Sequence, residues 1–449
     1  MPELTLPTQV SKKQVVIVLA SVVVVGGLYF GITSNLRKDT APPKVKLTIW
    51  GPLDERSAFD QMIAAYHLKR DNVDVSYEPQ DPDTYYEKLV NAIAVGTAPD
   101  LVLIDNRSLP LQMDKLAPLY VGHVYESMRE PIPFSITEFK GFFPTVAEQD
   151  FTEAGVVYSL PLYIDTLALL YNKNSLDQAG LAQLPVTWTD IQNYVPYLLS
   201  LNESGQIIKA AAALGGTDDN VKNGIDLLHL ILMQSGSEMT DATRTRVTLN
   251  GVQGKAAFNF YLQFANAASP AYTWNNLQPY SLDSIASGRV AMLFGYRDDL
   301  LTIKGKSPFA SLGVAPMPQP DGAQYATNYA QYWGLAVPKS TTSTQGWAWD
   351  FIVNTATDPS IMKAYVTATG HPPALRSVIN EAQGDPEYGV FVRQALTARS
   401  WYQPDASRIN RIFNTAVDAV LRGRTNSSDA LEQVEDQINQ LLAQKYREQ

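Results

Sequence analysis

The feature that most constrains the fold is an alternation of strand and helix patterns between residues 45 and 105. Residues 45–50, VKLTIW, alternate apolar and polar side chains as a strand does. The helix predicted next carries four apolar residues on one face: Phe59, Met62, Ile63 and Tyr66. A second strand, a second helix and the continuous apolar strand PDLVLID follow in turn. This order predicts an α/β layered domain with a parallel sheet.

The second helix of this series, over residues 81–96, also has an apolar face. The pattern assigns to it Tyr86, Leu89, Val90 and Ile93. Tyr85 lies off that face, so we expect it either at a ligand cleft or in solvent. Near the C-terminus a similar pattern predicts a helix that packs on a core, through Leu431, Val434, Ile438, Leu441 and Leu442.

Ligands of parallel α/β sheets bind at the carboxyl ends of the strands. Four side chains are expected there: Trp50, Asp54, Asp105 and Asn106. Trp50 either lines the cleft or caps the sheet. Asp105 and Asn106 either bind a ligand or form an Asx turn that closes the loop.

Composition argues against several classes of function. The formal net charge is -10 and basic runs are short, which does not favour a nucleic-acid partner. The chain has no cysteine, so disulfides, thiolate metal sites and a lipid-bearing cysteine are excluded. Its 4 histidines are far apart and form no HExxH motif, so neither a metal nor a cofactor is predicted.

Residues 15–32 form an uncharged apolar stretch that, as a helix, is ~27 Å long and can span a bilayer core. Two lysines precede it and no A-x-A cleavage site follows. We therefore predict an uncleaved transmembrane signal anchor, with residues 1–14 in the cytoplasm and residues 33–43 as a linker. The globular part is expected on the extracellular or periplasmic side of the cell membrane. A buried core helix is the alternative.

Seven segments, in order, carry a resemblance to a known family. They are YYEKLVNAIAVGTAPDLVLID, GVVYSLPLYIDTLALLYNKNSL, VTWTDIQNYVPYL, IASGRVAMLFGY, YWGLAVPKS, GWAWDFI and GHPPALRS. Together they resemble the extracellular solute-binding proteins of ATP-binding-cassette (ABC) importers, family 1, the branch that includes maltose-binding proteins. The resemblance covers residue 45 to the C-terminus. The predicted protein anchor departs from relatives that have a cleaved signal peptide or a lipid-bearing cysteine.

The resemblance implies a two-lobed α/β fold of the periplasmic-binding-protein type II. Lobe 1 would comprise residues 44–157 and 316–354, and lobe 2 residues 165–314 and 358–449. Hinge strands would lie near residues 158–165 and 313–318.

The implied function is that of a monomeric, non-enzymatic binding component. It would capture a sugar or oligosaccharide and deliver it to an ABC permease and its ATPase subunits. A surface-anchored glycosidase and a surface binding module without transport are the alternatives.

Further candidate ligand residues come from the same resemblance. Tyr296 is expected to stack on the solute, with core packing as its alternative. Of the neighbours Tyr332 and Trp333, one should face the cleft and the other the core, because strand side chains alternate. Arg376 and Trp401 are weaker candidates, with a surface salt bridge and edge packing as their alternatives.

Asp165 lies in the middle of the apolar run YSLPLYIDTLALLYN. An unpaired buried carboxylate costs several kcal/mol, so its place requires a reason. Tyr163 and Asp165 share one strand face by the two-residue period. We expect Asp165 to be a polar ligand of the solute and Tyr163 to form a wall beside it. The alternative is a buried aspartate held by an arginine or by backbone amides.

Overall fold

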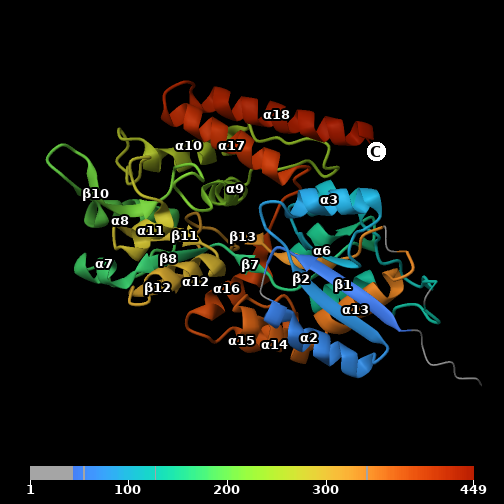
Figure 1. Cartoon of the computed structure of the whole chain (residues 1–449). Coiled ribbons are helices and arrows are strands. Elements are labelled where there is room, and N and C mark those ends of the chain that lie inside the picture. Colours follow the sequence, from blue (N-terminus) through green and yellow to red (C-terminus); the bar gives the residue numbers. More distant parts are fainter. Residues whose placement is uncertain (1–43, 54–55, 127, 340–341, 449) are drawn as a thin grey trace, which may run out of the picture. The chain divides into compact units, whose positions relative to one another are not determined.

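The computed structural model describes residues 44–448 except 54–55, 127 and 340–341 (Figure 1). The predicted anchor at residues 15–32 and the candidate Asp54 lie outside the described residues. Within the described part of the chain, no helix is both long and apolar enough to cross a membrane. Residues Val45–Gln449 form one compact unit.

The first sheet has the strand order β2-β1-β3-β14-β6. Strands β1 (Val45–Gly51), β2 (Val73–Pro79) and β3 (Leu101–Asp105) are parallel, and are connected by helices α2 (Arg56–Lys69) and α3 (Tyr85–Val95). This confirms the parallel α/β order predicted for residues 45–105. Strand β14 (Trp333–Ala336) then pairs antiparallel with both β3 and β6 (Leu160–Pro161).

Helix α3 differs from the prediction in the face it buries. Tyr85, Leu89 and Ala92 are buried, whereas Tyr86 is half-buried. Tyr85 is therefore not in solvent, and its place at a ligand cleft stays a prediction. The helix ends at Gly96, whose φ of 75° is the left-handed conformation that glycine adopts readily.

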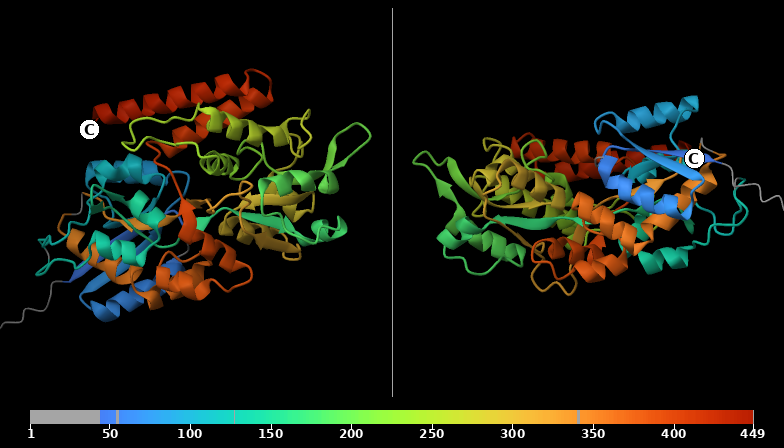
Figure 2. Two further views of the ribbon diagram at one scale, coloured as in Figure 1. Left: turned by 180° about the vertical axis from the view of Figure 1, so that it is seen from behind. Right: turned by 60° about the horizontal axis from the view of Figure 1, so that its bottom comes forward.

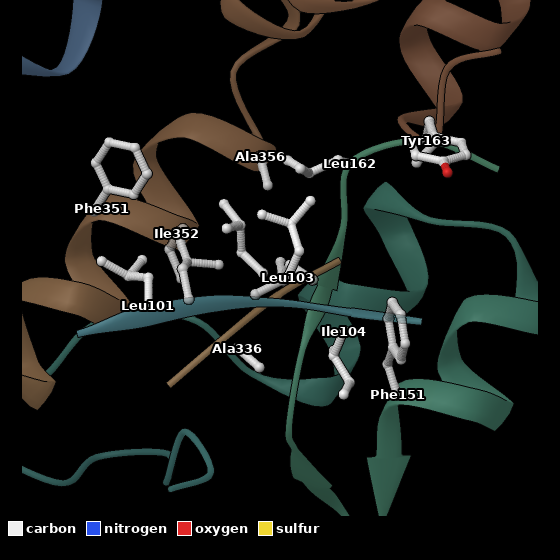
Figure 3. Packing of buried hydrophobic residues seen from close by; sticks show 14 of the residues in the cluster. Leu101, Leu103, Ile104, Phe151, Leu162, Tyr163, Ala336, Phe351, Ile352 and Ala356 are labelled. Atoms are coloured by element: carbon white, nitrogen blue, oxygen red, sulfur yellow. The ribbon is translucent and has the colours of Figure 1, made fainter. Parts of the chain in front are cut away.

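Helix α13 (Gln345–Ala356) covers one face of the first sheet. In Figure 3, Ile352 and Ala356 of this helix lie over Leu101 and Leu103 of β3, whereas Ile104 points to the opposite face. Successive side chains of a strand point to opposite faces of the sheet, so Leu101 and Leu103 share one face and Ile104 lies on the other. The same hydrophobic core, here called the first core, includes buried residues of α14 (Pro359–Thr369) and α15 (Arg376–Ala382).

The second sheet has the order β12-β8-β11-β10-β9. Its strands are β8 (Ala168–Asn172), β9 (Ser200–Leu201), β10 (Ile207–Ala213), β11 (Val290–Gly295) and β12 (Leu312–Ala315). Both faces are covered: Leu169 belongs to one hydrophobic cluster, whereas Ala168 and Leu170 belong to another. The cluster around Leu169 is called the second core.

Helices α9 (Gly224–Gln234), α10 (Val252–Leu262), α17 (Ala406–Leu421) and α18 (Ser427–Glu448) contribute to the second core. The views in Figure 2 show α17 and α18 running side by side. Of the face predicted for the C-terminal helix, Leu431, Val434, Ile438 and Leu442 are buried and Leu441 packs against the core from its edge. The predicted core-packing helix is confirmed.

The chain passes between the two cores three times, through a small sheet of order β15-β13-β7. Strand β7 (Asp165–Thr166) separates Ile164 of the first core from Leu167 of the second. Strands β13 (Asn328–Gln331) and β15 (Ala398–Arg399) form the other two crossings. We call the elements around each core the first and second lobe.

These crossings differ from two of the expected boundaries. Ala315 and Met317 belong to the second core, so the chain enters the first lobe at β13 and not near residues 313–318. The first core also extends to Ala398, so the return to the second lobe comes about forty residues after the boundary expected near residue 358. The reason is that α14 and α15 bury their apolar faces on the first core, contacts that local periodicity does not specify.

Candidate functional site

A cavity of about 380 Å³ lies where the two lobes meet. The first lobe contributes Asn106, Pro110, Met113, Gln149, Asp150 and Glu153. The second lobe and the third crossing contribute Met233, Glu238, Met239, Arg244, Ser400, Trp401 and Tyr402, among others. Aromatic, thioether, carboxylate, amide and guanidinium groups therefore surround one space.

Asn106 is positioned by the end of β3 and the start of β14. Its backbone N–H donates to the carbonyl of Tyr332 at 3.0 Å, and its side-chain oxygen accepts from the Tyr332 N–H at 3.1 Å. This leaves its amide nitrogen to donate to Asp150 at 2.8 Å. Asn106 thus ties the end of β3 to the start of β14, two interior strands of the first sheet, and lines the cavity.

Asp150, near the end of helix α6 (Thr145–Phe151), is the best-connected carboxylate of the cavity wall. It accepts hydrogen bonds from Asn106, from the Tyr332 hydroxyl at 2.6 Å and from the Ser400 hydroxyl at 2.5 Å. Burial raises the pKa of Asp150 to about 6, and these hydrogen bonds oppose the rise. Ser400 follows the crossing strand β15, so Asp150 ties the first lobe to that crossing.

Arg244 lines the cavity from a tight loop of the second lobe. Its φ is 57°, unusual for a residue with a side chain. Asp241 holds the loop by accepting from the backbone N–H groups of Thr245 at 2.7 Å and Arg246 at 3.2 Å. The guanidinium pairs with Glu153 of the first lobe at 2.6 Å.

The ring of Tyr402 has two cations near it. The guanidinium carbon of Arg244 and the ammonium of Lys445 are each 5.1 Å from its centroid. Cations over a tyrosine face are attracted by the ring quadrupole. Lys445 also donates to the carbonyl of Pro110, so the end of α18 contacts the first lobe.

A buried ion pair adjoins the cavity and joins the lobes. Arg107, one residue after Asn106, donates to both carboxylate oxygens of Asp226 in α9, at 3.0 and 3.1 Å. The Tyr296 hydroxyl donates to the same carboxylate at 2.9 Å. Burial alone would lower the pKa of Arg107, but the charges of Asp226 and Asp105 outweigh it and the pKa lies well above its usual value. Arg107 is therefore charged at every physiological pH.

The structure brings only some of the predicted residues to the cavity. Asn106 and Trp401 line it, and Tyr332 lies behind Asp150 as a fully buried side chain. The Asp105 carboxylate accepts from the backbone N–H of Arg107 at 2.6 Å. Of the two roles expected for Asp105, this contact corresponds to the Asx turn. Tyr296 is buried in the second core and reaches the lobe junction through its hydroxyl.

Other predicted residues lie away from the cavity lining. The Trp50 indole donates to Glu78 at 2.8 Å, and the Tyr85 hydroxyl donates to the carbonyl of Leu103 at 2.8 Å. Trp333 stacks on Tyr86 with 6.2 Å between ring centroids. The Arg376 Nε–H donates to the carbonyl of Phe143 at 2.8 Å.

Asp165 and Tyr163 also lie outside the cavity lining. Asp165 is buried and accepts from the backbone N–H groups of Thr166 and Arg297, both at 2.8 Å. Burial, and then the charge of Asp298, raise its pKa well above the usual value. Tyr163 stacks on His371 with 4.0 Å between ring centroids. The arrangement matches the alternative of an aspartate held by backbone amides.

Several lining residues were not candidates from the sequence. Asp150 lies inside a short helix, where no strand-end rule applies, and Glu153 follows that helix. Arg244 lies in the loop segment DATRT, whose Asp-x-Thr spacing is a signal for a tight turn. Within the described residues, no group of three or more His, Cys, Asp or Glu side chains is arranged to hold a metal ion.

In chemical terms, the cavity offers flat aromatic surface beside planar carboxylate and amide groups. The apolar C–H faces of a solute pack on aromatic rings, whereas its neighbouring hydroxyl groups bind to carboxylates and amides. A polyhydroxylated solute fits both kinds of surface.

Comparisons with known proteins point to the same class. A family model described as "Bacterial extracellular solute-binding protein" matches residues 61–389. A putative binding protein of Brucella abortus (strain 2308) is 25% identical over 135 residues, which are 30% of each chain. The first curated relatives are thus matched over less than a third of their length. The maltotriose-binding protein of Pyrococcus abyssi is 22% identical over 396 residues, 84% of this chain and 78% of that one.

Solved structures share the fold. The cyclic α-maltosyl-1,6-maltose binding protein of Arthrobacter globiformis matches with a TM-score of 0.72 at 20% identity, over 89% of this chain and 99% of that chain. A sugar-binding protein of Xanthomonas citri matches with a TM-score of 0.71 at 19% identity, over 89% and 98% of the two chains. At this level of identity the likeness establishes the two-lobed α/β architecture.

Proposed function

The chain belongs to the family of bacterial extracellular solute-binding proteins, and we propose that it captures a saccharide in the cavity between its two lobes. The observation that carries this proposal is the lining of that cavity. Trp401 and Tyr402 supply aromatic surface, and Asp150 and Asn106 supply hydroxyl-binding groups. The volume of about 380 Å³ falls within the range of small-molecule sites. Relatives described as binding maltotriose and maltosides support the same solute class.

Delivery of the solute to an ABC permease and its ATPase is part of the proposal, and the family membership supports it. We further propose that residues 15–32 anchor the protein in the cell membrane, with the globular part outside. The support is the uncharged apolar stretch in the sequence. Extraction of membranes with alkaline carbonate tests the anchor: an anchored chain stays in the pellet, whereas its release would overturn this part.

A thermal-shift screen of the full-length protein against mono- and oligosaccharides tests the solute class. A saccharide at 100 times its Kd should stabilise the protein by about 2.7 kcal/mol. Tyr402→Ala should reduce the shift, whereas Tyr197→Ala, on a side chain that is 67% exposed, should preserve it. A shift with another class of solute, and none with any saccharide, would overturn the proposal. Hydrolysis of the saccharide would favour the glycosidase alternative.

A further inference from the structure

One face of α9 runs along the junction between the lobes. Asp226, His229 and Met233 lie three, four and seven residues apart, so they share that face. Asp226 binds Arg107 of the first lobe, and Met233 lines the cavity. His229 therefore lies between a contact across the lobes and the cavity wall.

His229 is 2% exposed and is surrounded by aromatic rings. Its ring centroid lies 4.8 Å from Phe413, 5.2 Å from Trp401 and 5.9 Å from Tyr329. Neither Nδ1 nor Nε2 has a hydrogen-bond partner among the described residues. Burial, and then the charge of Arg107, lower its pKa to about 3, so the imidazole is neutral. A neutral imidazole has one N–H donor and one acceptor nitrogen.

Two neighbours of His229 also have buried nitrogens without partners in the part of the chain that the structure describes. These are Nε1 of Trp401, which is 6% exposed and lines the cavity, and Nε of Arg107. Each buried polar atom without a partner costs about 1–3 kcal/mol, and folded proteins keep few of them. Here they gather behind one wall of the cavity, where a solute can supply the missing partners.

We propose that His229 and Trp401 form a hydroxyl-recognition site at the floor of the cavity. Because a hydroxyl both donates and accepts, it can donate to the acceptor nitrogen of the neutral His229 imidazole and accept from the indole N–H of Trp401. Met233, one turn from His229, has a flexible unbranched side chain that can change rotamer to admit the hydroxyl. The site deepens, and rests on, the proposed capture of a saccharide.

This arrangement selects against solutes that lack the hydroxyl. A deoxy analogue leaves the acceptor nitrogen of His229 and the indole N–H of Trp401 without partners, and sites built to bind a hydroxyl reject such analogues strongly. His229 is therefore a specificity-determining residue for one particular hydroxyl of the solute.

Titration calorimetry with the saccharide that binds best, and with its monodeoxy analogues, tests the site. In the wild-type protein one analogue should bind at least about tenfold more weakly than the parent saccharide. His229→Phe should weaken the parent to a similar degree while binding that one analogue as the wild type does. His123→Phe, on an exposed histidine of the first lobe, should change neither affinity.

The outcomes separate the two proposals. If His229→Phe binds the parent like the wild type, or weakens the parent and every analogue equally, the hydroxyl site is overturned while saccharide capture stands. If the wild type binds no saccharide, both fall. Should His229→Phe fail to fold, Trp401→Phe removes the indole N–H and keeps an aromatic ring, and the same loss of discrimination is expected from it.

Discussion

Burial and hydrogen bonding compete at Asp150. Burial raises its pKa to about 6, above the usual value of 3.8. The folded protein therefore binds more protons than the unfolded chain between these two pH values. The stability that protonation contributes is complete below about pH 4 and is lost as the pH rises through 6. An asparagine at this position resembles the protonated aspartate, because its amide can donate to Ser400 while its oxygen accepts from Asn106 and Tyr332.

We therefore expect Asp150→Asn to lack this loss of stability. Between pH 4 and pH 7 the melting temperature of the wild type should fall relative to that of the variant. Calorimetric melting curves at intervals across this range measure the difference. Parallel profiles for the two proteins would show that Asp150 titrates in the folded state as it does in the unfolded chain.

Tyr296 shows how burial changes a prediction made from sequence. As an exposed stacking residue it would be replaceable by alanine with little effect on the melting temperature. The structure buries it in the second core and ties its hydroxyl to Asp226. Tyr296→Ala should lower the free energy of unfolding by about 3–5 kcal/mol, as large-to-small core changes do. Tyr296→Phe removes only the hydroxyl and should cost about 1–2 kcal/mol. Urea unfolding measures both, and equal losses would contradict this division.

At the scale of elements, β14 is packed too closely to accept a side chain at Gly334. A Cβ there would lie 2.4 Å from the Ser159 hydroxyl oxygen, 2.5 Å from the Leu160 carbonyl oxygen and 2.6 Å from Phe151. The strand is held between β3 and β6, so it cannot move away. Gly334→Ala should lower the free energy of unfolding by about 1–3 kcal/mol or more.

Gly141 provides a matched control in helix α5 (Ile136–Phe142), because a Cβ there meets no atom of the described residues within 4 Å. Gly141→Ala should raise stability by about 0.5–1 kcal/mol through helix propensity. Denaturant unfolding of both variants makes the comparison. If both alanines had the same effect, the packing at Gly334 would not be the cause.

Local periodicity predicted the elements whose partners are close in sequence. Strands β1 to β3 and their helices alternate within residues 45–105, so their pattern specifies them. The pairing of β14 with β3 depends on contacts more than two hundred residues apart, which no local pattern contains. The same limit explains the two misplaced crossings and the cavity: Asp150 gains its role only because β14 and β15 bring Tyr332 and Ser400 to it.

At the scale of the molecule, contacts between the lobes differ in how much water surrounds them. Arg107 and Asp226 have side chains that are 19% and 8% exposed, whereas Arg244 and Glu153 are 34% and 45% exposed. Exposed ion pairs contribute about 0–1 kcal/mol. Removing one partner of a buried pair costs about 3–5 kcal/mol, because a desolvated charge is left without its partner. The Arg107–Asp226 pair should therefore dominate the preference for the arrangement in which the lobes touch.

We expect Asp226→Asn to shift the protein without solute toward separated lobes, since separation returns Arg107 to water. Small-angle X-ray scattering should record a larger radius of gyration, and the Kd for the solute should rise in proportion to the smaller fraction of competent molecules. Glu153→Gln, which breaks the exposed pair, should leave both quantities nearly unchanged. A radius of gyration for Asp226→Asn equal to that of the wild type, with equal solute affinity, would mean that apolar contacts and not this ion pair hold the lobes together.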